Sequence, residues 1–204
     1  MAGGRFDAPS GEFATAYLAT TQYGACIEKL APLRPDIGLE ARISAFLDED
    51  PDPEHDIPLS RQVAHDFCTD HVCVSATVRP EARFIDVDAT ETHRALHDQG
   101  ASLSPELRAL IEEHHVRRID RGAFLSHVRP LTRLLALELY GLYGNEPNVI
   151  GIRYPSSLDP DAECWAIWDT GEHLVSTYDV APIEFTNTSL RAAAERLGLT
   201  LPPS

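Results

Sequence analysis

Two short stretches far apart in the chain contain side chains suited to binding and reacting with a ligand. In the first, Tyr17 follows Arg5 by twelve residues and Glu28 follows Tyr17 by eleven. The second contains Arg153 and, three residues later, Ser156. An arginine can bind an anion through two parallel hydrogen bonds, and a carboxylate can stabilise positive charge. These residue types make both stretches candidates for a binding or catalytic site.

Each of these residues also has an ordinary structural interpretation. A single glutamate such as Glu28 on an amphipathic helix usually faces solvent, and Arg5 beside a turn can simply pair with an acid. Tyr17 in a strand is more often part of a core than a ligand platform, and Ser156 after Pro155 is a common turn former. The flanking motifs and their order, rather than any single residue, favour the functional interpretation.

The flanking motifs resemble those of the RES domain family, which is named after its Arg, Glu and Ser residues. In chain order they are GGRF at 3–6, YLA at 17–19, A-x-x-E at 25–28 and GIRYPSS at 151–157. The resemblance covers residues 3–185, and it is weakest between 31 and 70. Each motif alone is modest, but the ordered set is specific.

The resemblance implies a fold similar to ADP-ribosyltransferase domains, with NAD as the substrate and no further cofactor. Family members are toxins that destroy NAD by hydrolysis or phosphorolysis, or that transfer ADP-ribose to a protein. They are usually paired with a DNA-binding antitoxin of the Xre type. The resemblance therefore predicts an NAD-degrading toxin whose partners are NAD and a protein antitoxin.

The resemblance also assigns roles to the candidate residues. Cleavage between nicotinamide and ribose passes through an oxocarbenium-like transition state, which a carboxylate such as that of Glu28 would stabilise. Arg5 would hold the pyrophosphate, and Tyr17 would stack on a ring of NAD. Ser156 would orient the nicotinamide ribose or amide. We expect Glu28 and Ser156 to be catalytic, and Arg5, Tyr17 and Arg153 to bind substrate.

Three functions remain open from the sequence. The first is an NAD glycohydrolase or phosphorylase, and the second is a mono-ADP-ribosyltransferase acting on a protein. The third is a non-catalytic nucleotide-binding or interaction module. Family members usually carry an earlier strand with another ligand-binding arginine, whereas four residues precede Arg5 here. We therefore expect the NAD site to lack that arginine, which is the feature that motivates the third function.

Other chemical signals in the chain are weaker. His65, Cys68, His71 and Cys73 are all possible zinc ligands, but four ligands within nine residues rarely close a tetrahedral site. We expect no metal site there. The chain has neither a phosphate-binding P-loop nor a dinucleotide-binding glycine fingerprint, which disfavours a kinase or a dehydrogenase.

The acidic composition of the chain mainly argues against certain classes of binding partner. Lys and Arg number 17 against 32 Asp and Glu, so the net charge is −15. Such an acidic surface repels nucleic acids and anionic membranes, and it suits a basic protein partner. The four cysteines do not suggest a disulfide framework, and no signal peptide or membrane-spanning run is visible. We expect a cytoplasmic protein, and the sequence leaves open whether it forms a homo-oligomer.

The hydrophobic pattern predicts which elements position the candidate residues. Strands are expected at 14–18, 72–78, 82–87, 149–153, 164–169 and 174–185. Helices are expected at 23–30, 104–118, 130–142 and 189–197, the third being the most apolar. Ser104 is expected to cap the second of these helices, and Asn187 or Thr188 the last.

The expected fold is a single α+β domain over residues 1–204, of the mixed type found in ADP-ribosyltransferases. Its central antiparallel or mixed sheet would be flanked by helices. Because strands lie near both ends of the chain, the ends must meet to complete the sheet. Residues 31–70 are expected to be loop-rich or an insertion, with a solvated acidic stretch at 48–54.

Overall fold

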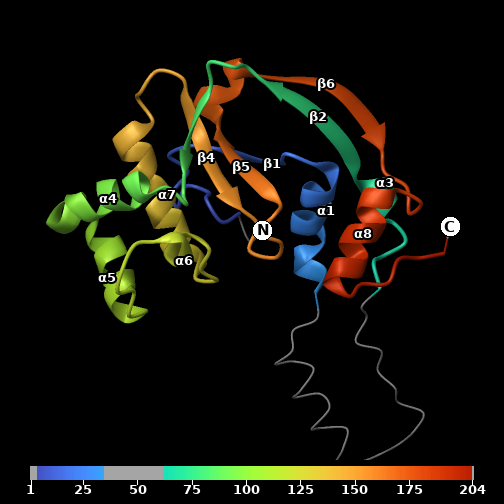
Figure 1. Cartoon of the computed structure of the whole chain (residues 1–204), viewed down its shortest axis with the longest axis horizontal. Helices are drawn as coiled ribbons and strands as arrows, with labels where there is room; N and C mark the ends of the chain where they lie inside the picture. The colour runs from blue at the N-terminus through green and yellow to red at the C-terminus, as the bar shows by residue number, and fades with distance from the viewer. Residues whose placement is uncertain (1–3, 35–61, 204) are drawn as a thin grey trace, which may run out of the picture. The chain divides into compact units, whose positions relative to one another are not determined.

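The computed structural model describes residues 4–34 and 62–203, and the chain divides into two compact units (Figure 1). One unit joins Met1–Thr21 to Ser75–Asp179, and the other joins Gln22–Val74 to Val180–Ser204. The predicted α+β fold with a central mixed sheet and flanking helices is confirmed. A single domain over 1–204 stays a prediction, and the acidic stretch 48–54 lies outside the described residues.

A four-stranded sheet with the order β1-β5-β4-β3 forms the centre of the first unit. Strand β1 (Thr15–Ala19) pairs antiparallel with β5 (Glu163–Trp168), which pairs antiparallel with β4 (Val149–Pro155). Strand β4 in turn pairs parallel with β3 (Arg83–Asp86). The pairing of β1 with β5 joins an early segment to a late one, as the sequence predicted.

Helices cover one face of this sheet and enclose the main core (Figure 1). They are α4 (Thr90–Gln99), α5 (Pro105–Glu113), α6 (Arg121–Phe124) and α7 (Arg129–Tyr143). Leu131, Leu135 and Leu139 recur every four residues on α7, so they lie on one side of the helix and are buried. They share a cluster with Ile152 and Ala166 of the sheet. The prediction that this helix is the buried one is confirmed.

The opposite face of the sheet carries a smaller cluster of Ile150, Ile167 and Leu174. Leu174 ends a 3-10 helix, η3 (Asp169–Leu174), which follows β5 directly. Gly151 allows β4 and β5 to approach here, because a Cβ at this position would lie 2.1 Å from the carbonyl oxygen of Ala166. A side chain at residue 151 would therefore separate the two strands.

A separate two-stranded sheet pairs β2 (Val72–Val78) with β6 (Val175–Pro182). Both strands were predicted, although the second ends at Pro182, before the expected end at residue 185. The boundary between the two units falls within each of these strands. The chain therefore passes from one unit to the other through β2 and β6.

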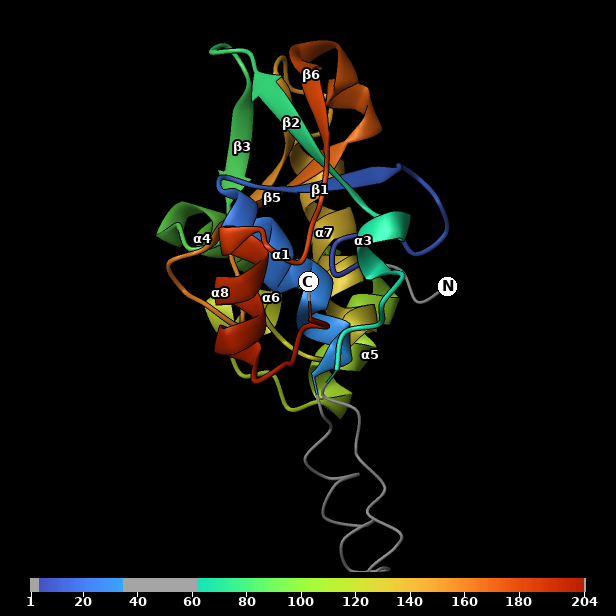
Figure 2. The same ribbon diagram turned by 90° about the vertical axis from the view of Figure 1, so that its right-hand side faces the viewer.

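In the second unit, α1 (Gln22–Leu30) packs against α8 (Thr188–Leu197), and Figures 1 and 2 both show them side by side. Asn187 caps α8, since its Oδ1 accepts from the backbone nitrogens of Ser189 and Leu190 at 3.0 and 3.1 Å. Gly198 ends the helix at φ +69°, a left-handed conformation that favours glycine. Two short elements also lie in this unit: η1 (Ala31–Leu33) and α3 (Phe67–Asp70).

The helix expected at 104–118 begins as predicted, but it ends earlier and lacks the expected cap. It ends at Glu113, and His115 adopts φ +51°, which cannot continue a right-handed helix. Ser104 stands at the N-cap position but caps nothing: its Oγ is buried without a hydrogen-bond partner among the described residues. The backbone nitrogen of Ser104 instead donates to Glu138 Oε1 at 2.8 Å. Helix α4 was not predicted at all.

All four cysteines are free thiols, in agreement with the absence of a disulfide framework. No helix within residues 4–34 and 62–203 is both long and apolar enough to cross a membrane.

Candidate active site

The turn at residues 4–7 holds the side chain of Tyr17, which comes from β1. The Tyr17 hydroxyl donates to Asp7 Oδ1 at 2.7 Å and accepts from the backbone nitrogen of Phe6 at 2.8 Å. The other oxygen of Asp7 accepts from the backbone nitrogen of Gly4. Tyr17 remains 40% exposed. Its hydroxyl is therefore fixed while part of its ring is open to solvent.

This environment keeps the Tyr17 phenol protonated. Burial raises the pKa of Tyr17, and so does the hydrogen bond to the Asp7 carboxylate. The hydrogen bond from the Phe6 nitrogen and the positive charge of Arg129 act in the opposite direction and lower the pKa, but they do not reverse the shift. A neutral phenol bonded on both sides is a poor acid or base, so the ring is the part of Tyr17 best placed to serve a ligand.

Arg5 anchors the same turn to the rest of the first unit. Its Nη1 donates to the carbonyl oxygens of Phe124 and Ser126 at 3.4 and 2.8 Å, and its Nη2 donates to Ser157 Oγ at 3.1 Å. The carbonyl of Arg5 accepts from Thr132 Oγ1 at 2.8 Å. Only 8% of Arg5 is exposed. Its guanidinium is thus occupied by the protein itself, and pyrophosphate binding by Arg5 stays a prediction.

Ser156 lies directly after β4 and is buried, with 1% of its surface exposed. Its Oγ accepts from the backbone nitrogen of Leu158 at 3.1 Å, and its own nitrogen donates to the carbonyl of Ala162 at 2.8 Å. The neighbouring Ser157 accepts from Arg5. The two stretches singled out in the sequence therefore meet in space, through the contact between Arg5 and the end of β4.

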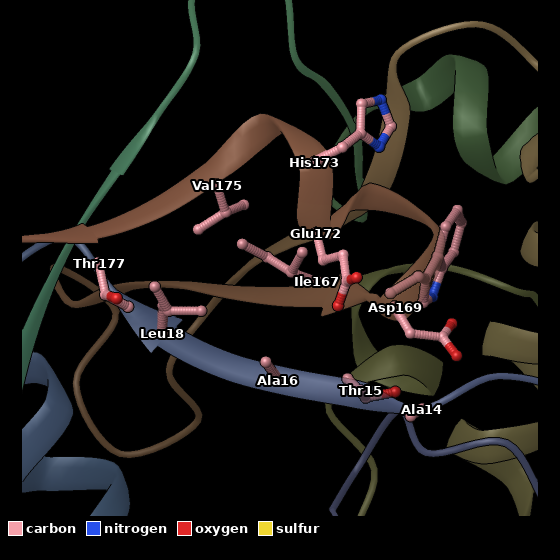
Figure 3. Close-up of a pocket in the computed structure, with 11 residues that line it drawn as sticks. Ala14, Thr15, Ala16, Leu18, Ile167, Asp169, Glu172, His173, Val175 and Thr177 are labelled. Atoms are coloured by element: carbon pink, nitrogen blue, oxygen red, sulfur yellow. The ribbon is translucent and has the colours of Figure 1, made fainter.

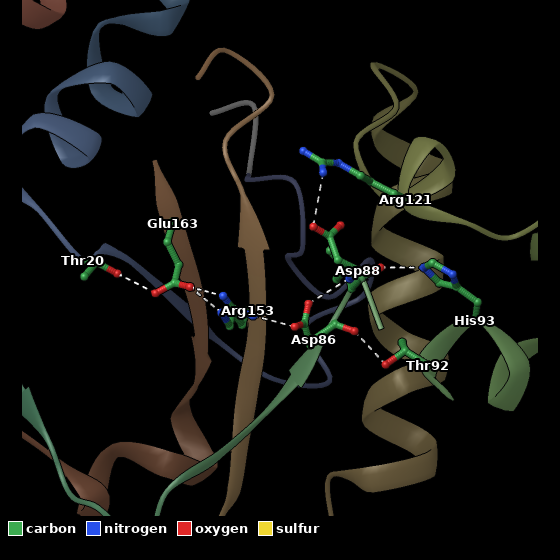
Figure 4. A network of polar contacts seen from close by, with 9 residues as sticks. Thr20, Asp86, Asp88, Thr92, His93, Arg121, Arg153 and Glu163 are labelled. Carbon is green, nitrogen blue, oxygen red and sulfur yellow. Dashed lines mark hydrogen bonds and ion pairs between the residues drawn. The ribbon is translucent and has the colours of Figure 1, made fainter. Parts of the chain in front are cut away.

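Arg153 belongs to a different polar network, shown in Figure 4. Its Nε donates to Glu163 Oε1 and its Nη1 to Asp86 Oδ2, both at 2.5 Å. The hydrogen bond to Glu163, followed by the charge of Asp86, raises the pKa of Arg153 further. The adjoining cavity of about 230 Å³ is also lined by Asp88 and Asp161. An anion entering this cavity would meet more carboxylates than arginines.

The strand register separates Tyr17 from Arg153. Tyr17 lies opposite Ala166, and Ala166 lies opposite Ile152, so these three side chains share one face of the sheet. Arg153 follows Ile152 and lies opposite Trp165, which places it on the other face. The structure therefore does not bring Arg153 together with Tyr17. A substrate-binding role for Arg153 stays a prediction.

A larger cavity of about 580 Å³ lies between β1, η3 and β6 (Figure 3). Its apolar lining includes Ala16, Leu18 and Ile167, and Asp169 and Glu172, both labelled in Figure 3, contribute carboxylates to the lining. Its size is in the range typical of ligand pockets. None of the residues predicted for the site lines it.

Glu28 lies on α1 in the second unit, whereas the other four predicted residues lie in the first. On this helix Cys26, Ile27 and Leu30 are buried, while Glu28 is half-buried. Among the residues that the structure describes, no hydrogen bond or ion pair involves the Glu28 carboxylate. A partly enclosed carboxylate with no partner in residues 4–34 and 62–203 is available for a substrate.

Sequence reasoning missed several residues around Tyr17. Asp7 bonds the Tyr17 hydroxyl, and Arg133 Nε donates to the carbonyl of Gly4 at 3.0 Å. Arg129, the first residue of α7, makes no side-chain hydrogen bond or ion pair within the described ranges. The turn-forming Gly and Asp of the first ten residues were visible in the sequence. Nothing there indicated that they contact Tyr17.

The segment with possible zinc ligands has an ordinary structural explanation. Nδ1 of His71 shares a hydrogen bond of 2.7 Å with the carbonyl of Phe67, and the two rings stack with centroids 4.5 Å apart. No group of three or more His, Cys, Asp or Glu side chains in the described part of the chain could hold a metal ion.

The mixed sheet, its helical cover and the arrangement of Arg5, Tyr17 and Ser156 define an α+β domain with a polar site at its N-terminal turn. Comparison with protein families matches the chain to the RES domain over residues 1–186. The chain belongs to the RES domain family. This family is associated with toxins that use NAD. No curated protein and no solved structure matches the chain.

Proposed function

We propose that this chain degrades NAD by breaking the bond between nicotinamide and ribose, with water or phosphate as the acceptor. Membership of the RES domain family supports an NAD-related toxin at the level of the family. NAD is the substrate in this proposal, and no cofactor is required, because the positively charged nicotinamide ring of NAD departs as neutral nicotinamide and leaves the positive charge on the ribose. Since NAD is an intracellular metabolite, the proposed location is the cytoplasm.

The Glu28 carboxylate, which has no partner among the described residues, is the observation that carries the proposal. As nicotinamide departs, positive charge develops on the ribose, and a nearby carboxylate stabilises it. Glu28 is half-buried, so its negative charge is less screened than on an open surface, and no described residue neutralises it. A carboxylate already paired with an arginine would stabilise the positive charge on the ribose much less.

The first unit would bind and orient NAD. The partly exposed ring of Tyr17 suits stacking on a planar ring of the dinucleotide. Ser156 accepts a hydrogen bond from Leu158 and retains its own proton, which would be donated to the ribose or the amide in this proposal. Arg5 supplies positive charge beneath the turn, and Arg129, whose side chain has no partner among the described residues, would bind the pyrophosphate in this proposal. The proposal does not depend on Arg153.

A protein antitoxin of the Xre type is the proposed partner. The net charge of −15 supports a partner with a basic binding surface. Growth arrest upon expression, relieved by co-expression of an Xre-type protein encoded beside this chain, would support the pairing. Arrest that such a protein does not relieve would contradict it.

The proposed function can be tested by measuring nicotinamide release from NAD by the purified chain, with and without phosphate. Release that requires phosphate identifies a phosphorylase, and release without it identifies a glycohydrolase. A labelled NAD analogue added to lysate separates these from a protein ADP-ribosyltransferase, which would leave label on a protein. A folded chain that binds NAD but releases no nicotinamide would refute the enzymatic proposal and leave a nucleotide-binding module.

A further inference from the structure

The hydroxyl group of Tyr17 is bonded on both of its sides. It donates its only proton to Asp7 Oδ1 at 2.7 Å and accepts from the backbone nitrogen of Phe6 at 2.8 Å. The proton cannot be donated to a ligand while the bond to Asp7 is in place. The exposed 40% of the residue must therefore act through its ring.

Gly4 closes the turn against this ring. A Cβ at residue 4 would lie 2.4 Å from Cε2, Cζ and Oη of Tyr17, far inside van der Waals contact. The backbone nitrogen of Gly4 also donates to the second oxygen of Asp7. Gly4 thus fixes both the ring and the carboxylate that holds it, which no residue with a side chain could do in this arrangement.

A second set of contacts holds the turn itself. The carbonyl of Gly4 accepts from Arg133 Nε at 3.0 Å, and the carbonyl of Arg5 accepts from Thr132 Oγ1 at 2.8 Å. Both partners lie on α7, whose buried leucines pack on the sheet. The core of the first unit therefore fixes α7, α7 fixes the turn through these two hydrogen bonds, and the turn fixes the Tyr17 ring.

We propose that Asp7 and Gly4 are positioning residues that hold the Tyr17 ring as a rigid stacking platform for a planar ring of the substrate. This inference rests on the proposed function, because it assigns the platform to NAD binding. It places the contribution of Tyr17 in the ring and excludes a direct contact between the Tyr17 hydroxyl and the substrate. Ordering the ring before binding lowers the entropic cost of stacking.

The test compares steady-state kinetics of NAD cleavage for Asp7→Ala, Tyr17→Phe, the double variant and Tyr17→Ala. Loss of the charge-assisted hydrogen bond should raise KM about tenfold in Asp7→Ala. Tyr17→Phe keeps the ring but loses the same bond, together with the bond from the Phe6 nitrogen, so it should show at least a similar rise. Because both changes remove the bond between Tyr17 and Asp7, the rise in KM of the double variant should be smaller than the product of the two single effects. In all three, kcat should change less than about threefold, since the platform binds rather than reacts.

Tyr17→Ala removes the platform itself and should raise KM at least about tenfold beyond Tyr17→Phe. Glu12→Ala is the matched control, because Glu12 also accepts from a backbone nitrogen, that of Ser10, at 3.0 Å in the same segment. It should leave KM unchanged. Gly4→Ala probes the platform without removing a charge and should reproduce the rise in KM seen for Asp7→Ala. Thermal unfolding shows whether each variant remains folded at the assay temperature.

Three results would overturn the inference. In the first, Tyr17→Phe raises KM as much as Tyr17→Ala does, while Asp7→Ala leaves KM nearly unchanged. The Tyr17 hydroxyl would then contact the substrate directly. Another is Asp7→Ala behaving like Glu12→Ala, and the third is additive effects in the double variant. A wild-type chain that neither binds nor cleaves NAD would instead refute the proposed function, and the platform with it.

Discussion

Replacing Arg5 with methionine should destabilise the first unit markedly. The change removes the guanidinium and keeps an unbranched stem. Arg5 is 8% exposed, and its two shorter bonds, to the Ser126 carbonyl at 2.8 Å and to Ser157 Oγ at 3.1 Å, would leave partners unsatisfied. Each such loss costs about 1–3 kcal/mol, so the free energy of unfolding should fall by about 3 kcal/mol.

Thermal unfolding followed by circular dichroism measures this loss. For a chain of this size, 1 kcal/mol corresponds to about 2–4 °C, so the Tm of Arg5→Met should fall by about 6–12 °C. Arg121→Met is the matched control, because Arg121 pairs with Asp88 at 3.4 Å on the surface, with 47% and 38% of the two side chains exposed. An exposed ion pair contributes about 1 kcal/mol or less, so this Tm should barely change.

The two variants separate an anchoring role for Arg5 from a purely ligand-binding role. Anchoring predicts a lower Tm in the absence of NAD. An Arg5→Met chain with the wild-type Tm and a greatly raised KM for NAD would refute the anchoring argument. Arg5 would then belong to the pyrophosphate site alone.

Three further predictions concern single positions. Gly151→Ala should prevent normal pairing of β4 with β5, since its Cβ would lie 2.1 Å from the Ala166 carbonyl; soluble yield and Tm report this, and a wild-type Tm would contradict it. Because burial and the Asp7 bond raise the pKa of Tyr17 above 10.0, this phenol should stay protonated at pH 10, and its contribution to stability should be lost only as the pH rises further. The phenolate absorbance of wild type minus Tyr17→Phe tests this, and a step below pH 10 would contradict it. Arg129→Ala should raise KM for NAD about tenfold if this arginine contacts the pyrophosphate, and an unchanged KM in the same kinetic assay would exclude that contact.

Most of the regular elements could be predicted because their patterns are local. The helix at 130–142 places leucines four residues apart at 131, 135 and 139, and the structure buries all three on α7. Helix α4 was missed because its pattern is weak: within Thr90–Gln99 only Thr92 and Leu96 are buried. The early end of α5 depends on the left-handed conformation of His115, and a histidine in the sequence does not predict that conformation.

The polar contacts of the candidate site could not be predicted, because they join residues far apart in the chain. Arg5 meets Ser157, 152 positions away, and Arg153 meets Asp86, 67 positions away. Residue type and flanking motifs marked both arginines as ligands for an anion. The sequence contained no sign that backbone carbonyls and carboxylates of the protein itself would occupy them.

The most direct test of the proposed function compares nicotinamide release by the wild type, Glu28→Gln and Glu195→Gln. Glu195 is the matched control, because it is an exposed helical glutamate on α8 of the same unit. The proposal predicts that kcat falls at least about a hundredfold in Glu28→Gln and stays at the wild-type value in Glu195→Gln. If Glu28→Gln is folded and releases nicotinamide at the wild-type rate, Glu28 does not stabilise the transition state and the proposed mechanism is wrong.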